Sequence, residues 1–196
     1  ETIHHVGFEH MTFNGSGFDM ALALGKESFF SAPSMGLFPR SEILNSLPPD
    51  MQSLGYASTY LTGGSGGQDL VSLLDEFNAY TFTTLVDTAI LPYMTGLASC
   101  SSRDGVLAMM LFTEEYLRVA REQHPGDYIK IMTSPLRDLI VILWDRAERT
   151  LKMAEGDPRL GHQDQAIRAH VYAPERLLEI RRVQEAVLPR ISMICF

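Results

Sequence analysis

The stretch LVSLLDEFNAY, residues 70–80, decides the fold class of this chain. Its apolar residues recur at intervals of three and four, the spacing that places side chains on one face of an α-helix. Asp69 stands just before the stretch, where a negative charge suits the positive end of the helix dipole. The pattern predicts a helix that begins near residue 67, ends before Pro92 and buries one face, made of Leu70, Leu73, Leu74, Phe77 and Tyr80.

Two more stretches have the same periodicity, over about residues 104–123 and 135–154. Ser134 and Pro135 suit the cap and the first position of the later helix. On the earlier helix, the spacing of four between successive charged residues predicts a ladder of ion pairs on the solvent side, formed by Glu114, Arg118 and Glu122.

Weaker patterns predict helices over residues 163–172 and 174–188. The connections between all these helices are short, so neighbouring helices are expected to pack antiparallel. The sequence therefore predicts a mainly α fold, a single-domain antiparallel helical bundle.

The first third of the chain differs from the rest, because glycine and proline interrupt it repeatedly. We expect one domain over residues 1–196, in which an irregular segment, 1–66, packs on a helical core, 67–196. Within that segment short helices are expected over 18–26 and 41–46, with Ser41 capping the second. Residues 55–62 are expected to be a short strand or an extended lead-in.

Composition excludes two classes of partner. The chain has 196 residues, of which 45% are hydrophobic and 20% charged, and its net charge is −8. It has no cluster of Lys and Arg of the kind that binds nucleic acid. It also has no apolar run of about 18 residues, so no membrane span is expected.

The chain has two cysteines, Cys100 and Cys195, and begins at Glu1 rather than at methionine. These features favour an exported protein, secreted or periplasmic, in which a disulfide between the two cysteines closes a long loop. The alternative is a pair of buried free thiols.

The glycine-rich stretch TGGSGGQD, residues 62–69, allows three interpretations. It is a hinge in which Ser65 or the loop caps the helix at Gln68, or its exposed amides bind an anion at a helix N-terminus. It also fits the G-x-S-x-G pattern of a nucleophile elbow, with Ser65 as the nucleophile. That third interpretation needs a strand before Ser65, and a downstream acid, Asp157 or Asp164, followed by His170.

We favour a ligand- or partner-binding module that uses this loop and nearby tyrosines. The expected ligand is a small or anionic molecule, or a protein, bound without turnover. The expected binding residues are Gly64, Ser65, Gly66, Asp69 and Tyr80, with Tyr56 and Tyr60 nearby.

A zinc-dependent hydrolase is the alternative. His5, Glu9 and His10 lie close together in the stretch IHHVGFEHM, residues 3–11, although their spacing differs from the H-E-x-x-H pattern of zinc hydrolases. The stretch DEFNAY, residues 75–80, resembles the second conserved helix of some zinc peptidase-like domains, where a glutamate follows the histidine motif. The resemblance implies that Glu76 is a metal ligand or a catalytic group.

The stretch GHQDQAIRAHVY, residues 161–172, holds His162 and His170. Asp164 and Arg168 are spaced to form an ion pair along a helix. His170 shares a face with apolar residues, so it is expected to point toward the core, either as a buried histidine with a hydrogen-bond partner or as a catalytic or ligand-binding one.

Overall fold

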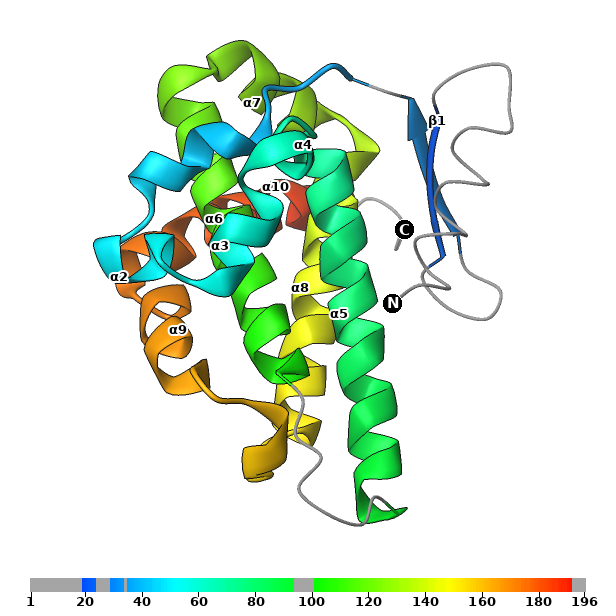
Figure 1. Cartoon of the computed structure of the whole chain (residues 1–196). Coiled ribbons are helices and arrows are strands. Elements are labelled where there is room, and N and C mark those ends of the chain that lie inside the picture. The colour runs from blue at the N-terminus through cyan, green and yellow to red at the C-terminus, as the bar shows by residue number, and fades with distance from the viewer. Residues whose placement is uncertain (1–18, 24–28, 34, 94–100, 192–196) are drawn as a thin grey trace.

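The computed structural model describes residues 19–23, 29–33, 35–93 and 101–191. The described part is mainly α-helical and forms a single bundle, which confirms the predicted fold class (Figure 1). Three long helices lie side by side: α5 (Leu70–Ile90), α6 (Ser102–Gln123) and α8 (Pro135–Met153). In this group α6 runs antiparallel to both α5 and α8, as the short connections indicated.

Helix α6 is the centre of the bundle. It packs against α5, α8, α7 (Pro125–Thr133), α9 (Asp164–Val171) and α10 (Pro174–Ile191). Every side chain from Ser102 to Leu117 is buried as a result. A helix that is enclosed on all sides buries its polar residues together with its apolar ones, and the polar residues then need partners inside the protein.

The predicted ion-pair ladder on this helix is wrong at Glu114. That residue is 1% exposed, and neither of its carboxylate oxygens has a hydrogen-bond partner in the described part of the chain. Arg118 does bind Glu122, at 2.6 Å, but its second partner is Glu115. The sequence could not reveal this burial, because it comes from α10 covering the face that we expected to meet solvent.

Side-chain caps fix the starts of two long helices. Asp69 Oδ1 accepts a hydrogen bond from Val71 N at 3.0 Å, so Asp69, and not Ser65, caps α5. Ser134 Oγ accepts from Leu136 N at 3.2 Å, which confirms the predicted start of α8. Helix α7 was not predicted. Pro125 starts this helix instead of only ending the previous one, because its fixed φ suits a first helical position.

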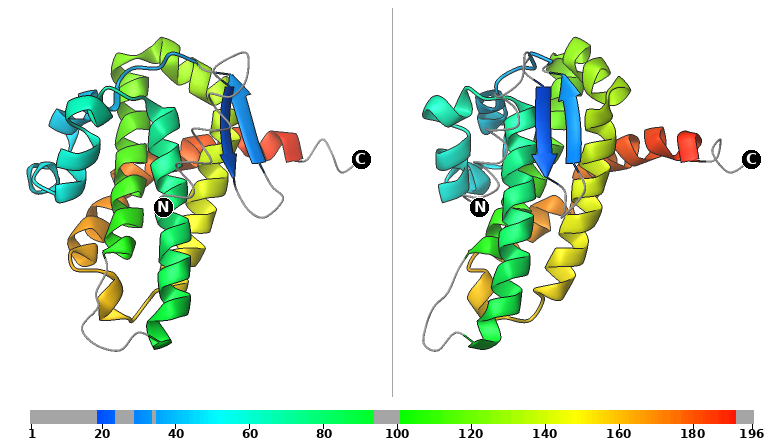
Figure 2. Two further views of the ribbon diagram at one scale, coloured as in Figure 1. Left: turned by 45° about the vertical axis from the view of Figure 1, so that its right-hand side comes forward. Right: turned by 90° about the vertical axis from the view of Figure 1, so that its right-hand side faces the viewer.

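The N-terminal third is more helical than expected. Residues 40–66 form four short elements on one face of α5 and α6 (Figures 1 and 2). The strand expected over 55–62 is wrong, since Ala57, Tyr60 and Leu61 are buried at helical spacing. The helix expected over 41–46 is confirmed, although Pro39 stands at its N-cap in place of Ser41. The four elements are the 3₁₀ helix η1 (Arg40–Ser46) and the short α-helices α2 (Pro49–Gln52), α3 (Gly55–Tyr60) and α4 (Gly63–Gly66).

A β-hairpin takes the place of the helix expected over 18–26. Strand β1 (Asp19–Ala23) pairs antiparallel with β2 (Phe29–Pro33), with Ala21 opposite Ser31. The hairpin lies beside the upper part of α8 (Figure 2). Pairing with a second segment outweighs the weak local helix signal here, as tertiary context often does.

One large cluster of buried side chains, from Leu37 to Val183, joins η1, α3 and the long helices. A smaller one joins η2 (Leu91–Tyr93), the end of α8 and η3 (Pro158–Leu160). Among the described helices, none combines the length and the hydropathy needed to cross a lipid bilayer. The expected boundary at residue 66, between an N-terminal segment and a helical core, stays a prediction.

Candidate binding groove

Two hollows on the surface meet at residues 162 and 163. The first, of about 560 Å³, lies between α2 and the start of α9. The second, of about 490 Å³, lies between α3, α5 and the start of α6. His162 and Gln163 line both, so the two hollows adjoin one another, and we call them together the α3–α9 groove.

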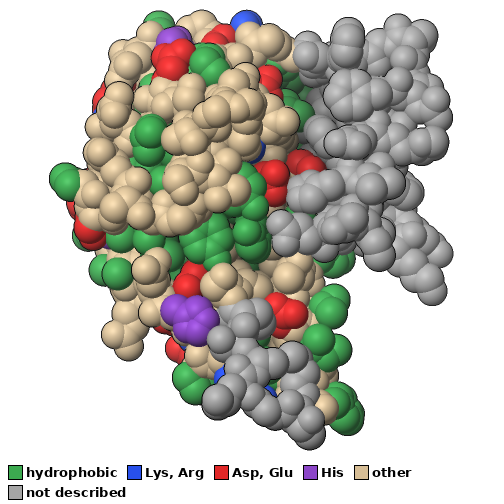
Figure 3. Space-filling view, viewed as in Figure 1, with side chains coloured by type: hydrophobic (Ala, Val, Ile, Leu, Met, Phe, Trp, Pro, Cys, Tyr) green, Lys and Arg blue, Asp and Glu red, His purple; other side chains and the backbone are tan. Residues whose placement is uncertain are grey.

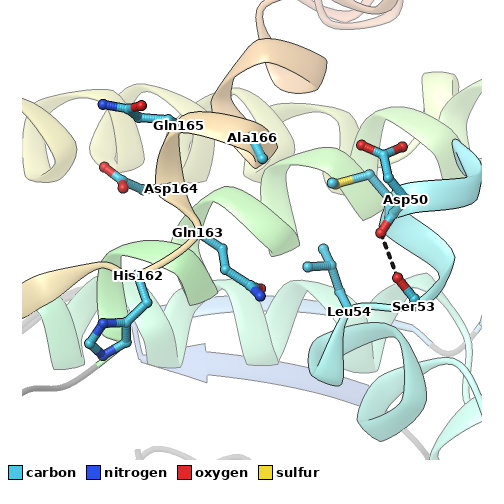
Figure 4. Close-up of a pocket in the computed structure, with 9 residues that line it drawn as sticks. Asp50, Ser53, Leu54, His162, Gln163, Asp164, Gln165 and Ala166 are labelled. Carbon is cyan, nitrogen blue, oxygen red and sulfur yellow. Dashed lines mark hydrogen bonds between the residues drawn. The ribbon is translucent and has the colours of Figure 1, made fainter.

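The first hollow has two walls (Figure 4). Asp50, Ser53 and Leu54 form one wall, and the segment 162–166 forms the other. Met51 and Leu54 are almost completely buried and give this hollow an apolar base. An aliphatic chain can therefore lie between polar rims.

Three tyrosines line the second hollow. Tyr56 and Tyr60 are four residues apart on α3, so they point the same way, and Tyr80 meets them from α5. The ring of Tyr80 lies edge-on to both partners: its centroid is 5.8 Å from that of Tyr56 at 73°, and 6.1 Å from that of Tyr60 at 82°. The hydroxyls of Tyr60 and Tyr80 lie 2.9 Å apart, and Tyr56 donates to Ser101 O at 2.7 Å. These contacts fix the orientation of all three rings.

Asp104 holds the middle of the groove in place. Its carboxylate, which is 2% exposed, accepts hydrogen bonds from His162 N at 2.9 Å and from Gln163 N at 3.1 Å. The donors belong to the segment that leads into α9, and the acceptor belongs to the first turn of α6. The two residues shared by both hollows are therefore held by a buried side chain from a different helix.

The groove is acidic. Its lining includes Asp50, Asp104 and Asp164, whereas no Lys or Arg is found among the described residues that line either hollow. Arg103 Nε lies 3.1 Å from Asp164 and offsets that charge. The ring of His170 lies 2.9 Å from Asp50, and this hydrogen bond holds the pKa of Asp50 below its ordinary value. On the face shown in Figure 3, acidic side chains and a histidine lie beside hydrophobic ones.

Behind the tyrosines lies Arg40, which is fully buried. Its Cζ is 5.6 Å from the centroid of the Tyr60 ring, and burial lowers its pKa. Its Nε donates to Ser65 O at 2.9 Å, and its Nη2 donates to Ser65 Oγ and, at 2.8 Å, to Gln68 Oε1. Arg40 therefore ties the glycine-rich stretch to the wall of the groove.

The structure separates the expected ligand-binding residues into two sets. Tyr80 lines the second hollow together with Tyr56 and Tyr60. Gly64, Ser65, Gly66 and Asp69 instead lie at the start of α5 and line neither hollow.

Two of the glycines in the stretch have structural reasons to be glycine. Gly63 has a φ of +57°, and a Cβ on Gly66 would lie 2.8 Å from the backbone of Leu61. The glycine-rich stretch is thus a compact helical turn and not an open loop.

The nucleophile-elbow geometry is not present around Ser65. Helix α3 stands where the elbow requires a strand, and the Ser65 hydroxyl accepts a hydrogen bond from Arg40. His170 is 30% exposed and binds Asp50, so the expectation that it points into the core is also wrong. It lies on α9, where it contacts α2 and not α4 (Figure 1).

The acids expected beside His170 have other roles. Asp164 pairs with Arg103 and not with Arg168. Asp157 caps η3 by accepting from Arg159 N at 2.9 Å, and its hydrogen bonds with Arg159 lower its pKa to about 2.

The proposed zinc ligands His5, Glu9 and His10 lie outside the described residues. Glu76 is half-buried on α5. Within the described ranges, no group of three or more His, Cys, Asp or Glu side chains is placed to hold a metal ion. The zinc site stays a prediction.

Cys100 and Cys195 also lie outside the described residues. Their pairing, and with it the expected secreted or periplasmic location, stays a prediction.

No protein-family model matches this chain, and neither a curated protein nor a solved structure matches it. The functional argument therefore rests on the groove. Sequence reasoning missed Asp50, Asp104 and Gln163, which become neighbours of the tyrosines only through contacts between distant segments. The one available signal was the polar run at 161–165, which interrupts the helical periodicity.

Proposed function

We propose that this protein is a binding module that holds an elongated small ligand in the α3–α9 groove without changing it chemically. The observation that carries the proposal is that His162 and Gln163 line both hollows, while the buried Asp104 fixes the backbone of these two residues. A site that is already in place before binding loses little conformational entropy when the ligand arrives.

The chemistry of the lining supports recognition. Tyrosines offer rigid faces with a polar tip, and the serine, glutamine and histidine side chains offer adaptable hydrogen bonds. The rings of Tyr56, Tyr60 and Tyr80 are already oriented by their own contacts. Such a combination of rigid aromatic faces and polar rims is typical of sites that orient a small ligand.

A thermal-melting panel tests the proposal. A ligand that binds the native state raises the melting temperature. We expect at least one class among cationic, neutral polyhydroxyl and anionic compounds to do so, and we expect Tyr56→Leu to reduce the increase. Tyr93→Leu is the matched control, because Tyr93 is 85% exposed and lines neither hollow. A panel in which no class acts, or in which both variants respond like the wild type, contradicts the proposal.

Elemental analysis of the same protein separates this proposal from the metal-dependent hydrolase. A purified chain with bound zinc, and a melting temperature that falls with chelator and with Glu76→Gln, favours the hydrolase. The binding module predicts melting that is indifferent to chelator.

A further inference from the structure

The charges of the groove indicate which ligand it takes. Asp50 in the first hollow and Asp104 in the second have no Lys or Arg within ion-pair distance in the described part of the chain, whereas Asp164 has Arg103. Asp50 does pair with His170, so each hollow keeps one carboxylate that has no Lys or Arg beside it among the described residues. A ligand with positive charge at two separated points complements this arrangement.

In the second hollow, aromatic rings as well as the carboxylate of Asp104 attract a cation. A ligand ammonium group that enters it meets Tyr56, Tyr60 and Tyr80, while Asp104 forms part of the same wall. The negative face of a tyrosine ring attracts a cation within about 6 Å of its centroid. Anionic ligands are disfavoured by the same two features.

The first hollow supplies an apolar surface between its charged points. Met51 and Leu54 line it and are almost completely buried, and Ala166 lines it from the other wall (Figure 4). Methylene groups gain free energy on such a surface, because they leave water there.

We infer that the α3–α9 groove binds a linear aliphatic polyamine, with one ammonium group beside Asp50 and another between the tyrosines and Asp104. This inference rests on the proposed function and names the ligand class for the same site. The aliphatic segment of the ligand crosses the junction at His162 and Gln163.

Isothermal titration calorimetry with the triamine spermidine tests the inference on the full chain. We expect saturable binding that weakens as salt rises, because screening acts on exposed charges. A neutral diol and a dicarboxylate of similar length are expected not to bind.

Charge variants distinguish binding in the groove from a nonspecific attraction of spermidine to the overall negative charge of the protein. Asp50→Asn is expected to weaken spermidine binding about three- to fivefold. Asp145→Asn removes the same charge from α8, where Asp145 is 59% exposed and pairs with Arg149, and is expected to leave binding unchanged. Asp50 is 60% exposed, so its variant is expected to fold, and its melting curve checks this.

Aromatic variants test the second hollow. Tyr56→Phe keeps the ring and is expected to keep most of the affinity, whereas Tyr56→Leu is expected to lose about fivefold or more. Equal losses for the two aspartate variants, or equal affinity for the two Tyr56 variants, overturn the inference.

Failure of the inference can be told from failure of the proposed function. If a neutral sugar or a lysine-containing peptide binds the groove and spermidine does not, the polyamine inference is wrong and the binding module stands. If no compound binds there, both are wrong.

Discussion

The ring of Tyr80 on α5 lies directly against Gly105 on α6. A Cβ added at position 105 would lie 2.2 Å from Cδ1 of Tyr80, whereas carbon atoms in contact lie about 3.5–4.0 Å apart. This close approach of the two helices lets Tyr80 form part of the groove wall. The same contact links the packing of the bundle to the shape of the proposed site.

Gly105→Ala is therefore expected to lower the free energy of unfolding by about 1–3 kcal/mol, since the Tyr80 ring must move. It is also expected to weaken ligand binding in the groove. Chemical denaturation and calorimetry measure the two effects. Gly126→Ala in α7 is the control, because a Cβ there meets no atom within 4 Å, and no loss of stability is expected. Equal stability for both variants contradicts the packing described here.

Glu114 is buried without a hydrogen-bond partner among the described residues, and burial raises its pKa to about 9 from an ordinary value of 4.5. The folded state therefore holds this proton more tightly than the unfolded chain does. The contribution of Glu114 to stability is complete below pH 4.5 and is lost as the pH rises through 9.

Glu114→Met is expected to raise the free energy of unfolding at pH 7 by on the order of 3 kcal/mol, and to reduce its fall between acidic and alkaline pH. Glu115→Met is the matched control, and it is expected to change the free energy of unfolding in the opposite direction. Glu115 binds Arg118 and Arg176, so its removal is expected to destabilise the protein by about 3 kcal/mol. Denaturant titrations across pH measure both, and a destabilising Glu114→Met would count against the burial described above.

Arg40 is expected to be the main support of the glycine-rich stretch. Arg40→Met leaves its partners at Ser65 and Gln68 without a donor, and is expected to lower the free energy of unfolding by about 3 kcal/mol. Ser65→Ala is expected to cost about 1–2 kcal/mol, and a fluorophosphonate probe is expected not to label Ser65. Arg149→Met, on an exposed ion pair, is expected to change stability by less than about 1 kcal/mol. Labelling of Ser65 by the probe would support the interpretation of Ser65 as the nucleophile of a serine hydrolase.

The Asp50–His170 pair joins α2 to α9, and its hydrogen bond lowers the pKa of Asp50. Its contribution is present above the ordinary pKa of 3.8 and is lost as the pH falls through the lowered value. His170→Leu is expected to raise the Asp50 pKa in a carboxyl NMR titration. His124→Leu, which breaks a separate pair with Glu42, is expected to leave it unchanged. If His170→Leu leaves the pKa of Asp50 unchanged, the result contradicts this pairing.

The periodic helices were predictable because their information is local. The stripe over 70–80 and the cap at Ser134 each lie within a few residues of the helix they define. The hairpin at 19–33 and the burial of Glu114 were not predictable in this way, because both depend on what packs against them from distant parts of the chain.

The same limit applies to the groove. The tyrosines of the second hollow were expected near the glycine-rich stretch, but the helical face that Tyr56 and Tyr60 share was not predicted. Asp104 reaches Gln163 across 59 residues of sequence, and no local pattern marks that contact. The glycine-rich stretch was the more conspicuous candidate site in the sequence. Its glycines Gly63 and Gly66 are instead explained by the backbone conformation and close packing of the turn.

The most direct measurement of the central claim is a map of backbone amide shifts during titration with spermidine. The account predicts that the largest saturable changes fall at His162 and Gln163 and at their neighbours around Tyr56 and Tyr80. Changes spread evenly over acidic positions such as Asp145, or no saturable change at all, would contradict it.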